Sequence, residues 1–124
     1  MSLRFYTLDL KGNPQEAESI EAWIHWAEHH THDRVTLKTR VGETWIGTIF
    51  LGIDFGREAF DMETLVKEPA LPLLYETMIF GGKRPGFSRK FNSRTQAIDF
   101  HHALENMVRD AEEEYEDIVV GDLV

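Results

Sequence analysis

The sequence predicts a single α+β domain: a sheet of four or five mainly antiparallel strands, with one helix from the N-terminal region and a C-terminal helix packed on it. Three observations predict this class. Alternating apolar and polar residues fill the middle of the chain, apolar residues recur at helical spacing near each end, and a glycine-containing turn links two strand segments. No repeat or linker divides the 124 residues, so the domain is expected to span residues 1–124, with an acidic tail from about residue 112.

The first strand and the first helix are expected before residue 31. Apolar and polar residues alternate over residues 3–10, which predicts a strand. Asn13 followed by Pro14 is a typical helix start, because Asn caps the first turn and Pro suits its first position. We predict that this helix continues to about His30. Its packing stripe would contain Ala17, Ile20, Ile24 and Ala27, with Trp23 beside them.

Two strands joined by a tight turn are expected next. Residues 34–42 alternate with a period of two, and Gly42 and Glu43 can close a hairpin into residues 44–54. The second of these segments is largely apolar on both faces. Such a strand belongs at the centre of a sheet.

The rest of the chain is expected to hold a long connection, two strands and a helix. Residues 55–72 are too long for a simple turn, and residues 57–67 can form a short helix within them. Strands are predicted at residues 73–80 and 88–91. Ser93, with Gln96 three residues later, is a capping box that starts the last helix. One stripe of that helix contains Ala97, Phe100, His101, Leu104, Met107, Val108 and Ala111.

Charge is distributed unevenly along the chain, whose formal net charge is −9. Residues 105–124, the acidic segment, hold eight acidic residues and one arginine, whereas residues 83–94 hold five basic residues and no acidic one. An acidic chain is a poor direct ligand for nucleic acid, because affinity there comes mostly from neutralising phosphates. The acidic segment suits a basic partner, or mimicry of nucleic acid towards a protein that binds it; the alternative is that it only solvates a helix end.

Several classes are excluded or disfavoured by what the chain lacks. There is no cysteine, so disulfide and thiol chemistry are excluded. No apolar stretch reaches the length of a membrane span, and the N-terminal residues do not have the pattern of a secretory signal. Neither a phosphate-binding glycine loop nor a G-x-S-x-G elbow is present. We expect an intracellular protein that does not bind membranes.

Glu76 is an ionisable residue in the middle of the apolar segment PLLYETMIFGG. Alternation places it on the face of its strand opposite to Tyr75 and Thr77. A carboxylate enclosed in a sheet without a partner is a candidate for proton transfer. The alternatives are a structural ion pair with an arginine such as Arg40, Arg89 or Arg94, and a place on a half-exposed face.

His101 is a second candidate for acid–base chemistry. It lies within the apolar stripe of the last helix, whereas His102 is expected to face water. Facing the sheet, His101 could meet Glu76, or Asp54 at the end of residues 44–54, and the carboxylate would then orient the imidazole. The alternative is a buried histidine with a structural hydrogen bond. If the protein were an enzyme, Glu76, His101 and Asp54 would be its catalytic residues.

Histidines on the first helix raise the question of a metal site. His25 and His29 are four residues apart and share a helix face, which His32 could extend if the last turn continues. That face is turned away from the packing stripe, and exposed ligands without supporting hydrogen bonds bind metal weakly. The glutamate of H-W-A-E-H precedes the second histidine, so the zinc-protease motif is absent. We expect no metal and no cofactor; if a metal binds, His25, His29 and His32 are the candidate ligands.

Two segments, WIGTIFLGIDFG and PLLYETMIFGG, precede a basic strand and the helix AIDFHHALENMV. Over residues 40–108 the chain thereby resembles a group of small phage- and prophage-encoded proteins of unknown function. The group shares a W-x-G/S-T-x-F-L-G-x-D pattern followed by P-x-L-Y/F-E-T-M-x-F-G-G. The connection over residues 55–72 is longer than in that pattern, and the histidines of the first helix are specific to this chain. The shared polar and glycine positions are Asp54, Glu76, Gly81, Gly82 and one of His101 and His102.

The resemblance implies a phage setting, and so the cytoplasm of a bacterial host. Together with the charge pattern, it favours a small accessory protein that binds another protein, for example as an inhibitor of a host defence or nuclease system. The partner would be a host or phage protein that is basic or binds nucleic acid. The alternatives are a small acid–base or metal-dependent enzyme, and a virion or assembly component that forms homo-oligomers. The expected partner-binding residues are Glu112, Glu113, Glu114, Glu116, Asp117, Lys83 and Arg84.

Overall fold

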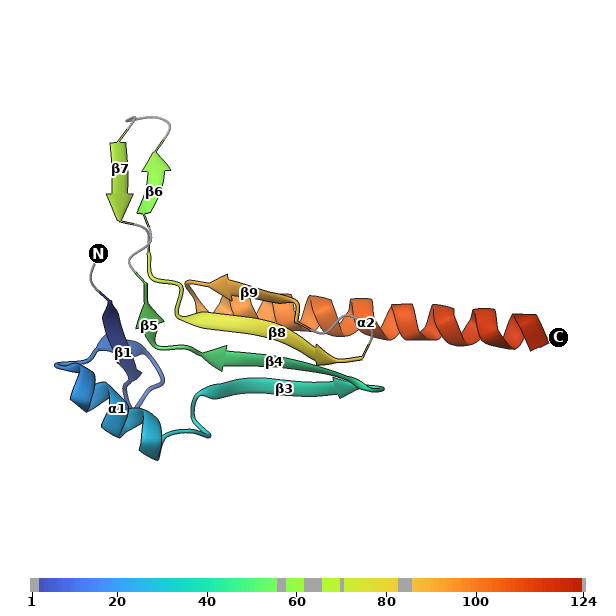
Figure 1. Cartoon of the computed structure of the whole chain (residues 1–124), viewed down its shortest axis with the longest axis horizontal. Coiled ribbons are helices and arrows are strands. Elements are labelled where there is room, and N and C mark those ends of the chain that lie inside the picture. The colour runs from blue at the N-terminus through green and yellow to red at the C-terminus, as the bar shows by residue number, and fades with distance from the viewer. Residues whose placement is uncertain (1–2, 56–57, 62–65, 70, 83–85, 124) are drawn as a thin grey trace.

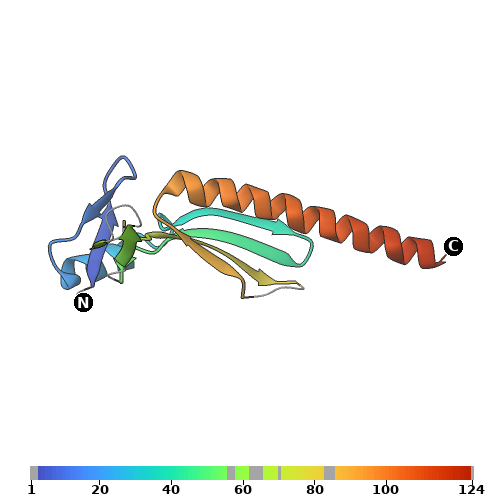
Figure 2. The same cartoon turned by 90° about the horizontal axis from the view of Figure 1, so that it is seen from above.

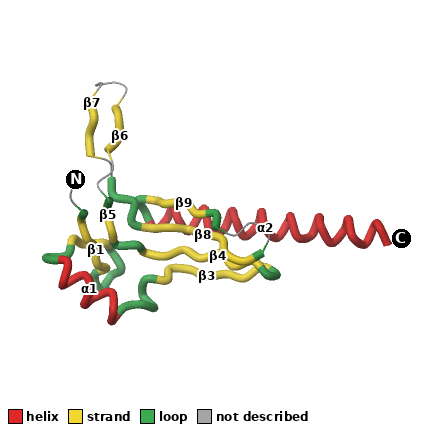
Figure 3. The backbone as a smooth tube through the Cα atoms, in the orientation of Figure 1, coloured by secondary structure: helices red, strands yellow, loops and turns green. Residues whose placement is uncertain are grey.

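The fold is α+β, as predicted, with two helices and mainly antiparallel sheets (Figures 1 and 3). The computed structural model describes residues 3–55, 58–61, 66–69, 71–82 and 86–123, and side chains within residues 3–55, 71–82 and 86–111. The elements are β1 (Arg4–Leu8), β2 (Pro14–Glu16), α1 (Ile20–His29), β3 (Val35–Val41), β4 (Thr44–Phe50), β5 (Ile53–Asp54), β6 (Glu58–Asp61), β7 (Val66–Pro69), β8 (Tyr75–Gly81), β9 (Ser88–Phe91) and α2 (Arg94–Leu123).

The main sheet contains four antiparallel strands in the order β3-β4-β8-β9. β4 lies between β3 and β8, as its two apolar faces predict, and the turn after Val41 pairs that residue with Thr44. α2 lies along one face of the sheet, the inner face (Figure 2). No described element covers the opposite, outer face in either view (Figures 1 and 2).

A break at Gly52 divides the predicted strand over residues 44–54 into two strands of different sheets. β4 belongs to the main sheet, and β5 pairs with β1 in a smaller sheet of order β2-β1-β5. Gly52 has φ +73°, which glycine adopts without steric cost, and its carbonyl accepts a 2.8 Å hydrogen bond from Tyr6 N. The chain therefore turns out of the main sheet at this residue.

The start of the first helix differs from the prediction. Residues 14–16 form β2, which pairs with β1, and Ala17 N donates to Phe5 O at 2.8 Å. Strand pairing therefore takes the backbone groups that a helix from Asn13 would have used. The helix begins at Ile20 instead, with Ser19 as its cap, because the Ser19 hydroxyl accepts from Ala22 N at 3.1 Å.

The predicted packing stripe of this helix is confirmed only in part. Ile20 and Ile24 are 47% and 45% exposed, and no residue of α1 is fully buried. The two tryptophans contact the body of the protein instead: Trp23 packs on Phe5 with ring centroids 5.5 Å apart, and Trp26 lies edge-on to Phe50 at 6.0 Å. Trp23 and Ala27 from the prediction are half-buried, so the packing face runs through Trp23, Trp26 and Ala27 and leaves Ile20 and Ile24 outside it.

The short helix predicted within residues 57–67 is not formed. The described residues of this segment form the antiparallel strands β6 and β7, which pair from Glu58 with Pro69 to Asp61 with Val66. A short apolar segment does not distinguish a helix from a strand by its periodicity alone, and here pairing between the two strands satisfies the backbone groups.

α2 begins where the capping pattern predicts, since Gln96 N donates to the Ser93 hydroxyl at 3.1 Å. It continues to Leu123, so the residues after Glu114 are part of the helix, and its last turns extend beyond the end of the main sheet (Figures 1 and 2). Met107 was predicted in the packing stripe but is 63% exposed, because it lies to one side of the line through Leu104 and Val108.

The interface between α2 and the inner face has two apolar clusters with a polar layer between them. Thr48, Thr77 and His101 form the polar layer and are 0% exposed. Each of them lies between members of the two clusters along its own strand or helix. One cluster contains Phe50, Leu74, Tyr75 and Ala97, and the other contains Ile46, Ile79 and Leu104.

Within the described part of the chain, no helix combines the length and the apolar content that crossing a bilayer requires.

Candidate functional site

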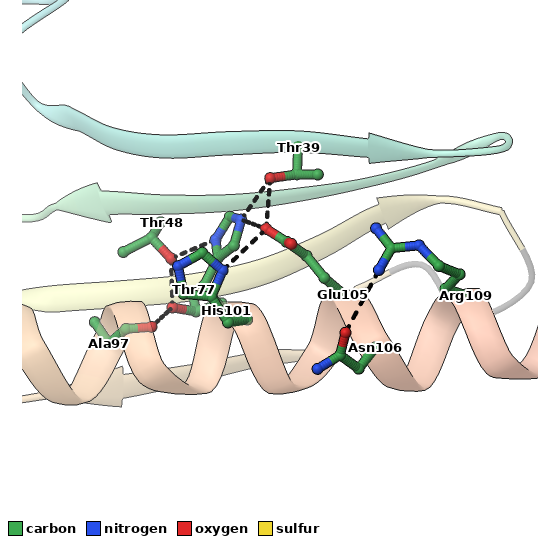
Figure 4. Close-up of polar contacts among 9 residues, drawn as sticks. Thr39, Thr48, Thr77, Ala97, His101, Glu105, Asn106 and Arg109 are labelled. Atoms are coloured by element: carbon green, nitrogen blue, oxygen red, sulfur yellow. Dashed lines mark hydrogen bonds and ion pairs between the residues drawn. The ribbon is translucent and has the colours of Figure 1, made fainter.

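His101 lies at the centre of a hydrogen-bond network between α2 and three strands (Figure 4). Its Nδ1 lies 2.8 Å from the Thr48 hydroxyl, and its Nε2 lies 2.9 Å from the Thr39 hydroxyl. Nε2 also lies 3.1 Å from Oε1 of Glu105, one turn along α2. The network continues from Thr48 to Thr77 at 2.7 Å. Both imidazole nitrogens therefore have partners.

The hydroxyl protons determine the tautomer of His101. Thr77 donates to the carbonyl of Ala97 at 3.2 Å, and because a hydroxyl has a single proton, Thr77 must accept from Thr48. The oxygen of Thr48 is then left to accept from Nδ1 of His101. His101 therefore has a proton on Nδ1. Thr39 gives its own single proton to Oε1 of Glu105 at 2.7 Å, so Nε2 faces two acceptor oxygens and bonds to them only when it is protonated as well.

Burial lowers the pKa of His101, because desolvation disfavours the imidazolium, although the Glu105 carboxylate acts in the opposite direction. Burial by itself would raise the pKa of Glu105, but hydrogen bonds from Thr39 and His102 and the nearby imidazoles outweigh it and lower that pKa. Burial thus favours a neutral imidazole, whereas the two acceptor oxygens beside Nε2 favour an imidazolium next to the Glu105 carboxylate. Since His101 is 0% exposed, this arrangement holds α2 on the sheet and does not present a base to a substrate.

The predicted meeting of Glu76 with His101 does not occur. Glu76 lies between Ile49 and Lys90 in the register of the main sheet. Its neighbour Thr77 contacts α2 on the inner face, so alternation places Glu76 on the outer face. Glu76 is half-buried there, which agrees with the alternative of a half-exposed face, and among the described residues it forms no ion pair, with an arginine or otherwise.

Asp54 is also separated from His101. It lies in β5, opposite Arg4 in the register of the small sheet, whereas His101 packs on the main sheet. The three residues named as catalytic candidates therefore do not form one site. They occupy the outer face, the inner face and a second sheet.

The histidines of α1 are arranged only in part as predicted. His25 and His29 share an exposed face with ring centroids 4.4 Å apart, and Nδ1 of His29 donates to the carbonyl of His25. α1 ends at His29, so His32 lies in the following turn and does not extend that face. In the part of the chain whose side chains are described, no three His, Cys, Asp or Glu residues are grouped as a metal site would require.

The predicted partner-binding residues fall largely outside the described side chains. Lys83 and Arg84 lie outside the described residues altogether. The backbone of residues 112–117 is helical and belongs to the part of α2 near its C-terminal end (Figure 1). The acidic residues there are Glu112, Glu113, Glu114, Glu116 and Asp117.

The outer face of the main sheet has an aromatic and basic surface that the sequence analysis did not identify. Trp45 and Phe80 lie opposite each other in the register of β4 and β8. The Lys38 ammonium lies 4.6 Å from the centroid of the Trp45 ring, and the Arg40 guanidinium 5.6 Å from it. The Phe80 ring covers Gly47, where a Cβ would lie 3.2 Å from it. Alternation along β3 and β4 indicates that these side chains share one face of the sheet. It does not indicate which face α2 covers, and so it could not show that this face is exposed.

Comparisons with protein families, curated proteins and solved structures give no match for this chain.

Proposed function

We propose that the protein is an accessory binding protein of phage type, which acts by docking the acidic C-terminal part of α2 on a basic or nucleic-acid-binding protein of the host or phage. An inhibitor of a host nuclease or defence protein is the form of this function that we favour. The observation that carries the proposal is the extension of α2 beyond the main sheet (Figure 2).

The length of α2 supports this role. Its 30 residues correspond to about 45 Å of helix. The described contacts that fix it to the sheet end near Val108, which packs with Ile46, Ile79 and Leu104. The acidic segment has a balance of −7, from eight acidic residues and one arginine. A helix of this kind offers a line of negative charge to a partner without moving the folded core.

The spacing of the acidic residues gives an energetic reason for a basic partner. Glu112 and Glu116, like Glu113 and Asp117, are four residues apart in a helix, where like charges destabilise it by about 0.2–0.5 kcal/mol per pair. The last turn of α2 contains no basic residue that would offset the helix dipole. Binding to a positive surface would offset the repulsion between these carboxylates. In the free protein, water and salt reduce that repulsion but do not remove it.

Neutralising the acidic residues is expected to slow association with the partner. The variant would carry Gln at Glu112, Glu113, Glu114 and Glu116 and Asn at Asp117. Because opposite charges steer encounter, we expect the association rate to fall by about tenfold or more at low salt and to lose most of its salt dependence. The partner is first captured from bacterial host lysate with the wild-type chain, and association is then measured at several salt concentrations.

A control with the same change in net charge separates local from global electrostatics. Gln replaces five exposed glutamates outside α2, namely Glu16, Glu18, Glu21, Glu28 and Glu43. The control is expected to retain most of the wild-type rate. Equal loss in both variants would leave no role for the acidic segment as a contact, and unchanged binding in the first variant would reject the proposed surface.

A second candidate function is an assembly component, and the outer face favours it. Lys38, Arg40 and Lys90 are exposed on strands β3 and β9 of the same sheet as Trp45 and Phe80. A basic, aromatic face and an acidic helix on one chain are complementary, so a second copy could receive the helix of the first.

Self-association is tested by sedimentation velocity at several protein concentrations. If copies assemble in this way, the sedimentation coefficient rises with concentration, falls with added salt, and stays at the monomer value in a Lys38→Gln, Arg40→Gln double variant. A single concentration-independent monomer would remove this candidate. So would a dimer that the double variant leaves intact.

A further inference from the structure

A cleft of about 880 Å³ lies between the small sheet, α1 and the start of α2. This volume is within the range of about 300–1,000 Å³ that is typical of small-molecule sites. Three connections line it: the turn between β1 and β2, the segment from α1 to β3, and residues 92–95 at the start of α2. Trp26 and Tyr75 also line it, and Tyr75 belongs to the apolar cluster around Phe50, against which Trp26 packs.

Tyr75 is the polar residue that points to a ligand. Its side chain is 2% exposed and its ring packs against Phe50, with centroids 5.3 Å apart, yet the residue lines the cleft. Among the described residues nothing accepts a hydrogen bond from its hydroxyl or donates one to it. No buried side-chain nitrogen or oxygen among the described residues lacks a partner, so this unpartnered hydroxyl is not enclosed in the core but is reached from the cleft, where a ligand can bond to it.

Positive charge lines the same cleft, because Arg94, the first residue of α2, is among its lining residues together with Tyr75. Burial raises the pKa of Tyr75, although Arg94 acts in the opposite direction, so the hydroxyl remains a donor at neutral pH. Within the described part of the chain the Arg94 guanidinium forms no ion pair or hydrogen bond. Ser93 occupies the amides of Gln96 and Ala97, which leaves the amides of Arg94 and Thr95 without helical partners.

We propose that this cleft binds a small phosphate ester, with the phosphate at the N-terminus of α2 between the Arg94 guanidinium and the Tyr75 hydroxyl. A phosphate offers several acceptor oxygens, and this position presents a bidentate donor, a hydroxyl, free amides and the positive end of a 30-residue helix. The cleft continues past this point to Asp33 and His30, so the remainder of the ligand would carry hydrogen-bond donors such as amino or hydroxyl groups. The site is at the opposite end of α2 from the acidic segment and does not depend on the proposed function.

Binding is measured by following backbone amide resonances of the full chain during titration with inorganic phosphate, adenosine monophosphate and adenosine at millimolar concentrations. We expect saturable shifts at Thr95 and Gln96 with the first two, tighter binding of the ester than of free phosphate, and none with adenosine. Tyr75→Phe keeps the ring in the core and Arg94→Gln changes an exposed side chain, so both variants should fold. Each is expected to weaken binding about tenfold, the effect of one hydrogen bond to a charged group.

The matched control is Arg109→Gln, which removes an exposed arginine of the same helix whose described bond is to Asn106. It should bind as the wild type does. Loss of binding confined to the Tyr75 and Arg94 variants would support the site. No saturation with either phosphate compound, or equal affinity in all variants, would overturn it. Ester binding no tighter than that of free phosphate would overturn the assignment of an ester.

Discussion

Replacing Gly52 by alanine is expected to lower the free energy of unfolding by about 2–4 kcal/mol, because a left-handed conformation and a steric clash add together. Gly52 has φ +73°, and an alanine Cβ there would lie 2.7 Å from Tyr6 O and 2.8 Å from Nε1 of Trp23. Neither atom can move freely, since Tyr6 O accepts a 2.9 Å hydrogen bond from that same indole nitrogen. The alanine would therefore disturb the junction of the two sheets.

Chemical denaturation of the wild type and two alanine variants measures this effect. Gly12 is the matched control, because it has φ +84° but no atom within 4 Å of the position that an alanine Cβ would take. Gly12→Ala therefore reports the backbone cost alone, about 1–2 kcal/mol. If Gly52→Ala cost no more than Gly12→Ala, the close approach of the sheets at this glycine would not contribute to stability.

Replacing His101 by alanine is expected to cost about 3–5 kcal/mol. The imidazole is among the largest fully buried side chains, so its loss leaves a cavity. It also removes one hydrogen-bond contact each of Thr48 and Thr39, which keep their bonds to Thr77 and Glu105, and each lost hydrogen bond contributes about 0.5–1.5 kcal/mol. Denaturation at pH 7 measures the loss. A cost below that of an exposed substitution such as His102→Ala would show that the network does not stabilise the fold.

The pH dependence of stability gives a separate test of the same network. The pKa of His101 is lowered in the folded protein, so the unfolded chain takes up a proton first, near its ordinary pKa of 6.5. Stability should therefore fall as the pH is lowered from about 6.5 to the folded pKa. The lowered pKa of Glu105 adds a further loss in the acid range, as the pH falls through its own folded pKa. His101→Gln should flatten the first decline, whereas His32→Gln, which changes an exposed histidine outside the network, should leave it unchanged.

The main elements of the fold could be predicted because their patterns are local. The two-sided apolar pattern placed β4 inside the sheet, and the capping box located the start of α2. The division into β4 and β5 at Gly52 could not be predicted from the local pattern, because Ile53 and Asp54 continue the strand pattern of β4. Only their pairing with β1 places them in a different sheet. The prediction of where α1 starts failed for the same reason. The first residues of the predicted helix form β2 instead, which pairs with β1.

The site could be predicted only as far as His101. Its place in the apolar stripe indicated a buried histidine, and the alternative of a structural hydrogen bond is the one that the contacts favour. Its partners were expected to be carboxylates of the strands, whereas they are Thr48, Thr39 and a glutamate of its own helix. Alternation had separated Glu76 from Thr77, but the face that α2 would cover depends on the tertiary fold.

The polar layer across the α2 interface has a consequence for how the helix is aligned. Apolar clusters tolerate sliding, because Leu104 or Ala97 would find hydrophobic neighbours at several positions along the sheet. His101 has no such freedom, since a shift of one turn would bring it against Ile46 or Phe50 and leave both of its nitrogens without partners. His101 thus fixes the axial position of α2 on the sheet. The positions of both ends of the helix follow from it.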